Sequence, residues 1–291
     1  MSAVGFIGLG AMGGRIAGRL LAAGHEVYGT NRTKAKAAPL IERGLTWRDT
    51  PREVAEAAAF VFSMVTDDAA LEAIASGPDG ILAGLRAGKV WIEMSTVSPE
   101  TSRDFASRAR MLGAGMLDAP VSGSLPAAED GSLTIMVGGS DGTFAELEPI
   151  LRELGTTVIR IGDNGSALLM KLAVNISLAE QMLAFSEGVL LAEQGGIDRA
   201  LAVSVLTESA IGSPMLRSRG PFVLELPEQA WFAVSLMRKD LTLALEAAAR
   251  LDVPLPSAAI AQQLFTAAHA MGYEDKDIAV VYEVLAEMAG E

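Results

Sequence analysis

The sequence predicts an α/β protein with a Rossmann-like, doubly wound and mostly parallel sheet, followed by an all-helical domain. Strand and helix patterns alternate along residues 1–163, which is typical of a parallel sheet with helices on both faces. Beyond that point the apolar spacing is helical throughout, beginning with a pattern over about residues 166–194. We therefore expect two domains, residues 1–163 and residues 164–291, joined by one long interdomain helix.

The first strand, helix and second strand give the clearest pattern in the chain. An apolar run at residues 4–7 enters the turn GLGAMG, a helical pattern follows, and a second strand covers residues 26–30. A dinucleotide-binding βαβ unit has this order, with glycines that let the backbone approach a pyrophosphate at the helix N-terminus. An ordinary glycine turn is the alternative. We expect six cofactor-binding residues here: Gly8, Leu9, Gly10, Ala11, Met12 and Gly13.

The end of the second strand indicates which dinucleotide binds. An NAD enzyme usually has Asp or Glu at this place, where the carboxylate accepts a hydrogen bond from the ribose 2′-hydroxyl. This chain has Asn31, Arg32 and Thr33 instead, and Lys36 follows. Because these side chains offer donors and positive charge to a 2′-phosphate, we expect NADPH, with NADH as a weaker cofactor. The other interpretation is a solvated basic loop without a ligand.

Further strands are predicted from short apolar runs at residues 60–65, 89–94, 116–118, 133–137 and 157–161. Thr50 and Ser98, each followed by proline, are typical N-caps of the helices between them.

Ligands of such sheets bind beyond the carboxyl ends of the strands. Met64, Val65 and Thr66 follow one predicted strand, and Thr96 follows the next. We therefore expect these four residues to contribute to the cofactor site.

The second half of the chain is predicted to be all helical. The long helix carries apolar residues at spacings of three and four and ends before Gly195 and Gly196. Its apolar surface is larger than monomers usually expose, so we expect a homodimer or homotetramer that associates through this domain.

Composition restricts the class of protein. The 291 residues carry a formal net charge of −13, which argues against a nucleic-acid partner, and no cysteine, which excludes disulfides and thiolate metal sites. We expect no metal.

No uninterrupted apolar run reaches the roughly 20 residues of a membrane span, and the N-terminus lacks the pattern of a signal peptide. A cytoplasmic protein without a membrane partner is the expectation.

Residues for proton transfer are few. Of the two histidines, His25 lies at the amino edge of the sheet and His269 in a late helix without polar company, so both are expected to be structural. Lys171 and Asn175 are one turn apart on the long helix and share a face, although a lysine that snorkels to water would fit equally well. Lys239 has the same two interpretations, a residue of the site or a solvent-exposed lysine on a helix.

Residues 119–124 read as an exposed, turn-rich segment. There Ser122 and Gly123 offer a hydroxyl and backbone N–H groups to a carboxylate.

At these residues the chain resembles the β-hydroxyacid dehydrogenase family over nearly its whole length. The motifs are GLGAMG at residues 8–13, DAPVSG at residues 118–123, GDNG at residues 162–165 with KLAVN at residues 171–175, and residues 232–241 ending in KDL. Within the family, Ser124 and the segments at residues 126–133 and 213–221 look most like the glyoxylate and succinic semialdehyde reductase branch. Hydroxyisobutyrate dehydrogenases more often have a second glycine where Ser124 stands. The reductase branch usually uses NADPH.

The resemblance implies a role for each candidate residue. Lys171 would be the general acid that protonates the substrate carbonyl oxygen, with a pKa lowered by a partly desolvated cleft and a second cation such as Lys239. Asn175 would hold the substrate hydroxyl or carboxylate. The remaining substrate contacts would come from Ser122, Gly123, Thr96, Phe232 and Lys239, of which Thr96 and Lys239 would also contact the cofactor.

Two departures from the family pattern bear on substrate fit, since Val174 replaces a second asparagine and Ala167 a glycine. Lys171 itself argues against the related imine reductases, which lack it.

The expected activity is reduction of small aldehyde or keto acids, such as glyoxylate and succinic semialdehyde, with NADPH. The alternatives are a 3-hydroxyisobutyrate or tartronate semialdehyde type of enzyme and, from another class, a non-catalytic NADPH-binding protein.

Overall fold

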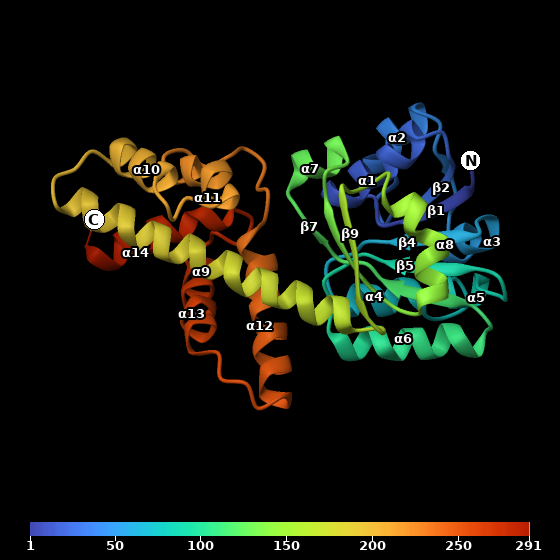
Figure 1. Ribbon diagram of the computed structural model, residues 1–291. Coiled ribbons are helices and arrows are strands. Elements are labelled where there is room, and N and C mark those ends of the chain that lie inside the picture. The colour runs from blue at the N-terminus through green and yellow to red at the C-terminus, as the bar shows by residue number, and fades with distance from the viewer. Residues whose placement is uncertain (291) are drawn as a thin grey trace. The chain divides into compact units, whose positions relative to one another are not determined.

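The chain forms two compact units in the computed structural model, Met1–Lys171 and Leu172–Glu291, and residues 1–290 are described (Figure 1). The first unit is the predicted α/β sheet domain, and the second is helical. We describe each unit by itself.

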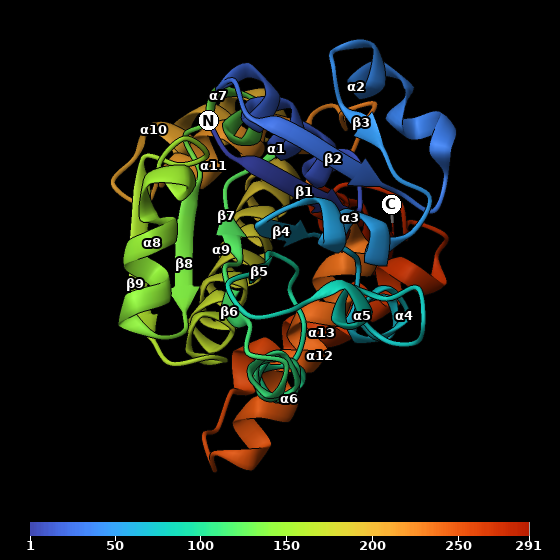
Figure 2. The same cartoon turned by 90° about the vertical axis from the view of Figure 1, so that its right-hand side faces the viewer.

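One sheet of nine strands organises the first unit. Its order is β3-β2-β1-β4-β5-β6-β8-β7, with β9 paired to β8, and Figure 2 shows β2, β1, β4, β5 and β6 in succession. Most pairs are parallel, but β8 runs antiparallel to β6 and β7. The strands are β1 (Ala3–Ile7), β2 (Glu26–Thr30), β3 (Thr46–Trp47), β4 (Phe60–Ser63), β5 (Val90–Glu93), β6 (Gly115–Asp118), β7 (Val121–Ser122), β8 (Thr134–Gly138) and β9 (Thr157–Gly162).

Eight helices belong to this sheet. They are α1 (Ala11–Ala22), α2 (Ala38–Glu42), α3 (Pro51–Ala57), α4 (Asp68–Ala75), α5 (Ile81–Gly84), α6 (Pro99–Met111), α7 (Leu125–Asp130) and α8 (Asp141–Leu151). The apolar side chains of α1, α2, α7 and α8 share one core, and those of α3, α4, α5 and α6 share another. The predicted doubly wound architecture is therefore confirmed.

Strand residues alternate between the two cores. On β5, Trp91 packs into the core of α3 to α6, whereas Ile92 packs into the core of α1 and α8. Both side chains are fully buried. The central parallel strands are apolar without interruption because each face is covered by helices.

The predicted helix caps are also present. Thr50 accepts a hydrogen bond from the Glu53 N–H at 3.1 Å, and Ser98 accepts one from the Thr101 N–H at 3.1 Å. Each cap satisfies one of the backbone donors that a helix start leaves without a partner.

Several short elements escaped sequence reasoning, namely β3, α2, α4, α5 and α7. Strand β7 lies in the segment that was expected to be only a turn. It is two residues long, so alternation of side chains could not indicate it.

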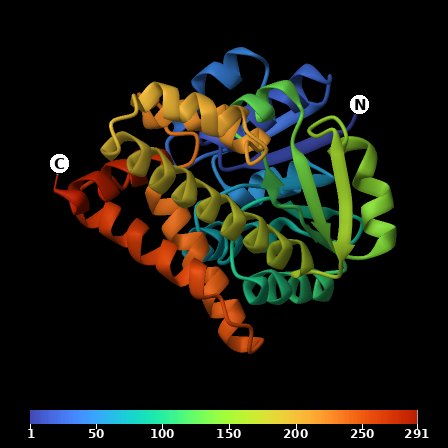
Figure 3. The ribbon, with the colours of Figure 1, turned by 60° about the vertical axis from the view of Figure 1, so that its left-hand side comes forward.

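The second unit is built on α9 (Ser166–Gln194), the predicted long helix, which starts in the first unit. Its other helices are α10 (Arg199–Glu208), α11 (Pro214–Arg219), α12 (Val234–Arg250), α13 (Pro256–Ala270) and α14 (Val281–Ala289). Figure 3 shows α12 and α13 beside each other. The described residues of this unit contain no strand, only an isolated bridge between Ala233 and Asp277.

Helix α9 is long and apolar enough to meet a length and composition criterion for a membrane span. Several of its apolar side chains are buried inside the protein, however. Leu168 packs in a core of the first unit, and Met182, Phe185 and Val189 pack in the core of the second unit with Phe265. Core packing therefore accounts for part of the apolar composition of this helix, while Leu169, Met170 and Leu191 are exposed.

Candidate active site

The glycine turn between β1 and α1 has the shape that a pyrophosphate requires. Gly8 has a φ of +95°, and a Cβ at this position would lie 2.1 Å from the Met64 carbonyl oxygen. A Cβ on Gly13 would lie 2.1 Å from the Gly8 carbonyl oxygen. Gly10, the N-cap of α1, has open space around the same position. Two glycines thus close the turn, and the third leaves room for a phosphate beside the helix N-terminus.

The residues that follow β2 have two roles. Asn31 shapes the glycine turn, and Arg32 and Lys36 remain exposed. The Asn31 side chain accepts a hydrogen bond from the Leu9 N–H at 3.1 Å and donates one to the Thr33 carbonyl oxygen at 3.0 Å. Arg32 and Lys36 are exposed, and neither side chain has a partner within residues 1–290. Asn31 therefore ties the glycine turn to β2, while the two cations face solvent.

The carboxyl ends of β4 and β5 are linked by Ser95. Its hydroxyl accepts a hydrogen bond from the Val65 N–H at 2.8 Å, and its own N–H donates to the Glu93 carboxylate at 2.9 Å. The Met64 N–H in turn donates to the Ile7 carbonyl oxygen at 2.9 Å. Met64 and Val65 are thereby fixed at the same edge of the sheet as the glycine turn.

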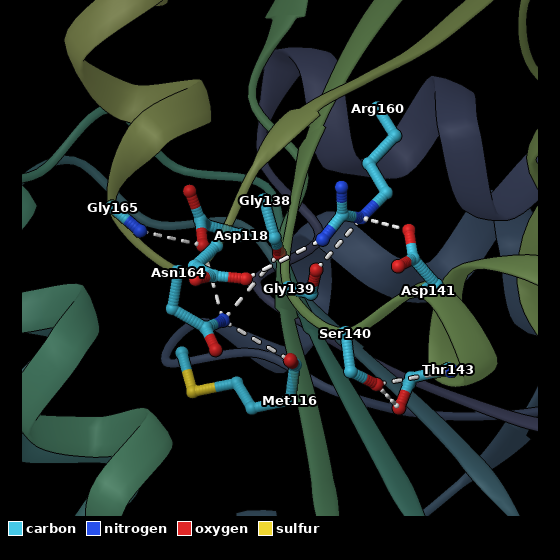
Figure 4. Close-up of polar contacts among 11 residues, drawn as sticks. Met116, Asp118, Gly138, Gly139, Ser140, Asp141, Thr143, Arg160, Asn164 and Gly165 are labelled. Carbon is cyan, nitrogen blue, oxygen red and sulfur yellow. Dashed lines mark hydrogen bonds and ion pairs between the residues drawn. The ribbon is translucent and has the colours of Figure 1, made fainter.

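Asp118 at the end of β6 joins two of the sequence motifs (Figure 4). Its Oδ1 accepts hydrogen bonds from the Gly165 N–H at 2.9 Å and from Asn164 Nδ2 at 3.1 Å. The carboxyl group is fully buried, and burial raises its pKa even though these hydrogen bonds oppose that effect. The start of α9 is consequently anchored to the end of β6.

Ser122 and Gly123 follow this anchor. Ser122 pairs with Thr134 of β8, and Gly123 has a φ of +133°. A Cβ on Gly123 would lie 2.9 Å from both Ala127 and Leu133 side chains. Glycine is therefore required at 123, and the turn presents the half-buried Ser122 at a defined position.

The helical unit brings Asn175 and Lys239 together through Asp240. Asn175 Nδ2 donates a 2.5 Å hydrogen bond to Asp240 Oδ2, and Lys239 Nζ lies 2.7 Å from Asp240 Oδ1. Asn175 and Asp240 are almost fully buried, whereas the Lys239 side chain is 21% exposed. Lys171 is one turn before Asn175 on α9. The arrangement fixes the Asn175 amide with its nitrogen toward Asp240.

Phe232, the expected pocket residue, lies in a loop held by a buried ion pair. Asp277 accepts hydrogen bonds from the N–H groups of Trp231 and Phe232, at 2.9 and 3.1 Å. Arg219 Nη1 donates to both oxygens of the same carboxylate at 2.6 Å. Asp277 thus connects α11 to the segment that precedes α12.

Within residues 1–290, neither histidine forms a hydrogen bond with these groups. His25 Nε2 lies 2.6 Å from a Glu153 carboxylate oxygen, and its Nδ1 accepts a hydrogen bond from the Ser2 N–H. His269 is in α13. Within residues 1–290 no group of three or more His, Asp or Glu side chains is placed to hold a metal ion.

Sequence reasoning missed Ser95, Asp240 and Asp277 as residues that organise the site. Asp240 had a signal, because it stands in the KDL motif beside Lys239. Asp277 had none, since it lies 45 residues beyond Phe232 in the chain.

Comparison with known proteins accounts for both halves of the chain. Residues 3–162 match the model of the NAD binding domain of 6-phosphogluconate dehydrogenase, and residues 165–285 match the model for NAD-binding of NADP-dependent 3-hydroxyisobutyrate dehydrogenase. Glyoxylate/succinic semialdehyde reductase 2 of Arabidopsis thaliana is 34% identical over 97% of this chain and 79% of its own length. The 2-(hydroxymethyl)glutarate dehydrogenase of Eubacterium barkeri is 34% identical over 99% of this chain and 96% of its own.

Solved structures agree with these relatives. A 3-hydroxyisobutyrate dehydrogenase from Salmonella typhimurium has a TM-score of 0.89 at 30% identity, covering 98% of this chain and 100% of that one. The structure described as Psf3 in complex with NADP+ and 2-OPP also has a TM-score of 0.89, at 27% identity over 97% of this chain and 99% of that one.

Fold, glycine turn and family models together define an NAD(P)-dependent oxidoreductase. The chain belongs to the β-hydroxyacid dehydrogenase family.

Proposed function

We propose that the protein is an NADPH-dependent reductase of small aldehyde or keto acids, with glyoxylate and succinic semialdehyde as the first candidates. The observation that carries this proposal is the buried pairing of Asn175 with Asp240, one turn from Lys171. A buried, hydrogen-bonded amide beside a lysine suits a site that orients a polar substrate for proton transfer. The relative in Arabidopsis thaliana with 34% identity bears this activity in its name.

The residues present fit the cofactor. The open space at Gly10 and the N-terminus of α1 would hold the pyrophosphate, and Arg32 and Lys36 would hold the 2′-phosphate. Met64, Val65, Thr66 and Thr96 would line the remainder of the site at the carboxyl edge of the sheet. When bound, NADPH would supply the hydride. The exposed cations and the lack of an acidic residue at Thr30–Thr33 favour NADPH over NADH.

Lys171 donates the proton in this proposal. It holds the proton toward the substrate carbonyl oxygen, releases it as the oxygen becomes a hydroxyl, and in the reverse direction takes it back as general base. Asn175 holds the substrate hydroxyl or carboxylate, and Asp240 fixes the Asn175 amide. Ser122 and Gly123 bind the substrate carboxylate with a hydroxyl and backbone N–H groups, together with Thr96, while Phe232 and Lys239 enclose the substrate.

A substrate panel tests the proposal. NADPH consumption should be measured with glyoxylate, succinic semialdehyde, tartronate semialdehyde and methylmalonate semialdehyde at equal concentration. We expect the highest kcat/KM with one of the first two. Highest activity with tartronate or methylmalonate semialdehyde would instead assign the protein to the tartronate semialdehyde or 3-hydroxyisobutyrate type. Absence of turnover with all four, despite NADPH binding, would contradict the proposed function.

Assembly and location form the last part of the proposal. We infer a homodimer or homotetramer through the helical unit, because Leu191, Leu201 and Val205 are large apolar side chains exposed on α9 and α10. A cytoplasmic location fits a protein that acts on small acids with NADPH. Sedimentation of the purified protein tests the assembly, and a single 30.3 kDa species at micromolar concentration would contradict it.

A further inference from the structure

One buried carboxyl group, that of Asp118, connects two segments of the first unit that the proposed reaction needs. Ser122 and Gly123, the proposed carboxylate-binding turn, follow Asp118 closely in the chain. Lys171, the proposed proton donor, is the last residue of the same unit and lies on α9, six residues after Gly165. Asp118 Oδ1 accepts a hydrogen bond from the Gly165 N–H at 2.9 Å. The carboxyl group is therefore a direct link between the segment that carries Ser122 and the helix that carries Lys171.

The bond to Gly165 fixes the first turn of α9. Backbone N–H groups at a helix start have no partner within the helix, and Asp118 supplies one here. The Gly165 carbonyl oxygen accepts the Leu169 N–H at 3.1 Å, so the hydrogen-bond ladder of α9 begins at this residue. Gly165 has a φ of +87°, and a Cβ on it would lie 2.9 Å from both Arg103 Nε and the Pro99 carbonyl oxygen. Its position is thus closely defined, and a shift of Gly165 displaces the turns that follow.

Asp118 is itself held in one position (Figure 4). Asn164 Nδ2 donates to Asp118 Oδ1 and to the Met116 carbonyl oxygen, each at 3.1 Å. A Cβ on Gly138 of β8 would overlap the Asp118 carboxyl group, so glycine is required there to leave room for it. The Asp118 side chain is fully buried. A group whose place is defined by packing and by hydrogen bonds is suited to position another residue.

The start of α9 is also held by an apolar contact. Leu168 is fully buried and packs with Phe105 in the core of α3 to α6. Without the Asp118 carboxyl group, this packing would still keep the start of α9 on the sheet, but the hydrogen bond that sets its exact position would be lost. A role in positioning can therefore be separated from a role in folding.

We propose that Asp118 is a positioning residue of the reaction, which sets the place of Lys171 relative to the turn of Ser122 and Gly123 by fixing the start of α9 to the end of β6. The roles of Lys171 and Ser122 rest on the proposed function, whereas the anchor itself does not. Asp118 touches neither the substrate nor the cofactor in this proposal. Its loss should consequently lower kcat and leave binding of NADPH nearly unchanged.

Two substitutions of Asp118 test the positioning role. Asp118→Ala removes the acceptor of the Gly165 N–H, and Asp118→Asn keeps an oxygen that can accept it. We expect kcat with the best substrate of the panel to fall about 10- to 100-fold in Asp118→Ala and to stay within about threefold of wild type in Asp118→Asn, because a small misplacement of a catalytic group is costly. The Kd for NADPH should stay within about twofold in both variants.

Ser140→Ala is the matched control for these variants. It removes another hydrogen bond to a helix start of the same unit, from the Thr143 N–H to the Ser140 hydroxyl at 3.2 Å. We expect the kcat of this variant to equal that of wild type. An Asp118→Ala variant with the kcat of wild type would overturn the proposal, as would a loss of activity that is confined to a raised Kd for NADPH.

Hydrogen exchange of the full protein tests the anchor without turnover. Asn164→Ala is a milder second variant, since it removes the half-buried amide that holds the Asp118 carboxyl group. In Asp118→Ala and Asn164→Ala, the backbone amides of residues 165–171 should exchange about tenfold faster than in wild type, and those of α1 should not change. Unchanged exchange at residues 165–171 in both variants would overturn the proposal. If exchange rises as expected but wild type turns over no substrate of the panel, the proposed function fails and the anchor stands.

Discussion

The amide nitrogen of Asn175 donates a 2.5 Å hydrogen bond to the carboxylate of Asp240 in the buried part of the helical unit. The same carboxylate pairs with Lys239 at 2.7 Å. One buried acid therefore connects α9, which carries Lys171, with α12, which carries Lys239. The consequences of this relationship can be tested by substitution.

Asp240→Asn should reduce turnover without abolishing cofactor binding. The substitution removes the negative charge that pairs with Lys239 and replaces one acceptor oxygen by an NH₂ group, so the ion pair is lost and the Asn175 hydrogen bond survives in only one amide orientation. Because a small misplacement of a substrate-orienting group is costly, we expect kcat to fall about 10- to 100-fold. The Kd for NADPH should change much less. Asp252→Asn is the matched control, since Asp252 is exposed and has a φ of +54° that Asn tolerates. A normal kcat in Asp240→Asn would refute the orienting role.

Arg32→Gln should separate the two cofactors. Arg32 is exposed and without a partner within residues 1–290, so its loss removes charge from the proposed 2′-phosphate site and little else. We expect the KM for NADPH to rise about tenfold or more and the KM for NADH to stay nearly constant. Arg86→Gln, at another exposed arginine of the same unit, serves as control. Equal changes for both cofactors would reject the assignment of the phosphate site.

Because the Asp118 carboxyl group is buried, we expect the stability of the protein to depend on pH. The pKa of this group is raised by burial, so the folded protein takes up a proton at this carboxyl at a higher pH than the unfolded chain does. The stabilisation from this carboxyl group is complete at pH values below its pKa in the unfolded chain. It is lost as the pH rises through its pKa in the folded protein. We therefore expect the unfolding free energy of wild type, relative to Asp118→Asn, to increase as pH falls from about 7 to about 4.5. Denaturant unfolding at both pH values measures this difference, and a decrease would contradict the account.

Replacing Lys89 should change the stability of the protein but not its catalytic activity. The Lys89 ammonium donates to the carbonyl oxygens of Ala55, Glu56 and Ala58 at the C-terminus of α3, and the residue is 5% exposed. Lys89→Met should leave these carbonyls without that donor and lower the unfolding free energy by about 1–3 kcal/mol. Its kcat/KM should be unaffected, because Lys89 precedes β5 at the amino edge of the sheet. Arg110→Met, at an exposed position, is the control for the loss of charge, and equal stability of the two variants would argue against the capping role.

Local pattern was sufficient for the longer parallel strands and for the long helix. The glycine turn, the apolar parallel strands and the period of α9 each follow from residues close in sequence. The antiparallel pairing of β8 with β6 and β7 could not be predicted in this way, because it depends on which strands meet after the chain has folded. Short elements such as β3 are too short to show a period.

The residues of the candidate site also fall into two groups, those that local sequence indicates and those that tertiary packing brings together. Residues within motifs, such as Gly10, Ser122 and Lys171, could be named from sequence, partly through the family resemblance. The groups that hold them are distant in the chain: Asp118 meets Gly165 across 47 residues, and Asn175 meets Asp240 across 65. Such pairs are fixed by tertiary packing, so only the structure could show that Asp240 unites Asn175 and Lys239.

Lys171→Met tests the central claim most directly. The variant keeps the length and apolar stem of the side chain and removes its proton. We expect the Kd for NADPH, from fluorescence titration, to stay within about twofold, and kcat with the best substrate of the panel to fall about 10²- to 10⁴-fold. Lys276→Met, at an exposed lysine, should match wild type in both measurements. A Lys171→Met variant that keeps near-normal kcat would contradict general-acid catalysis by Lys171.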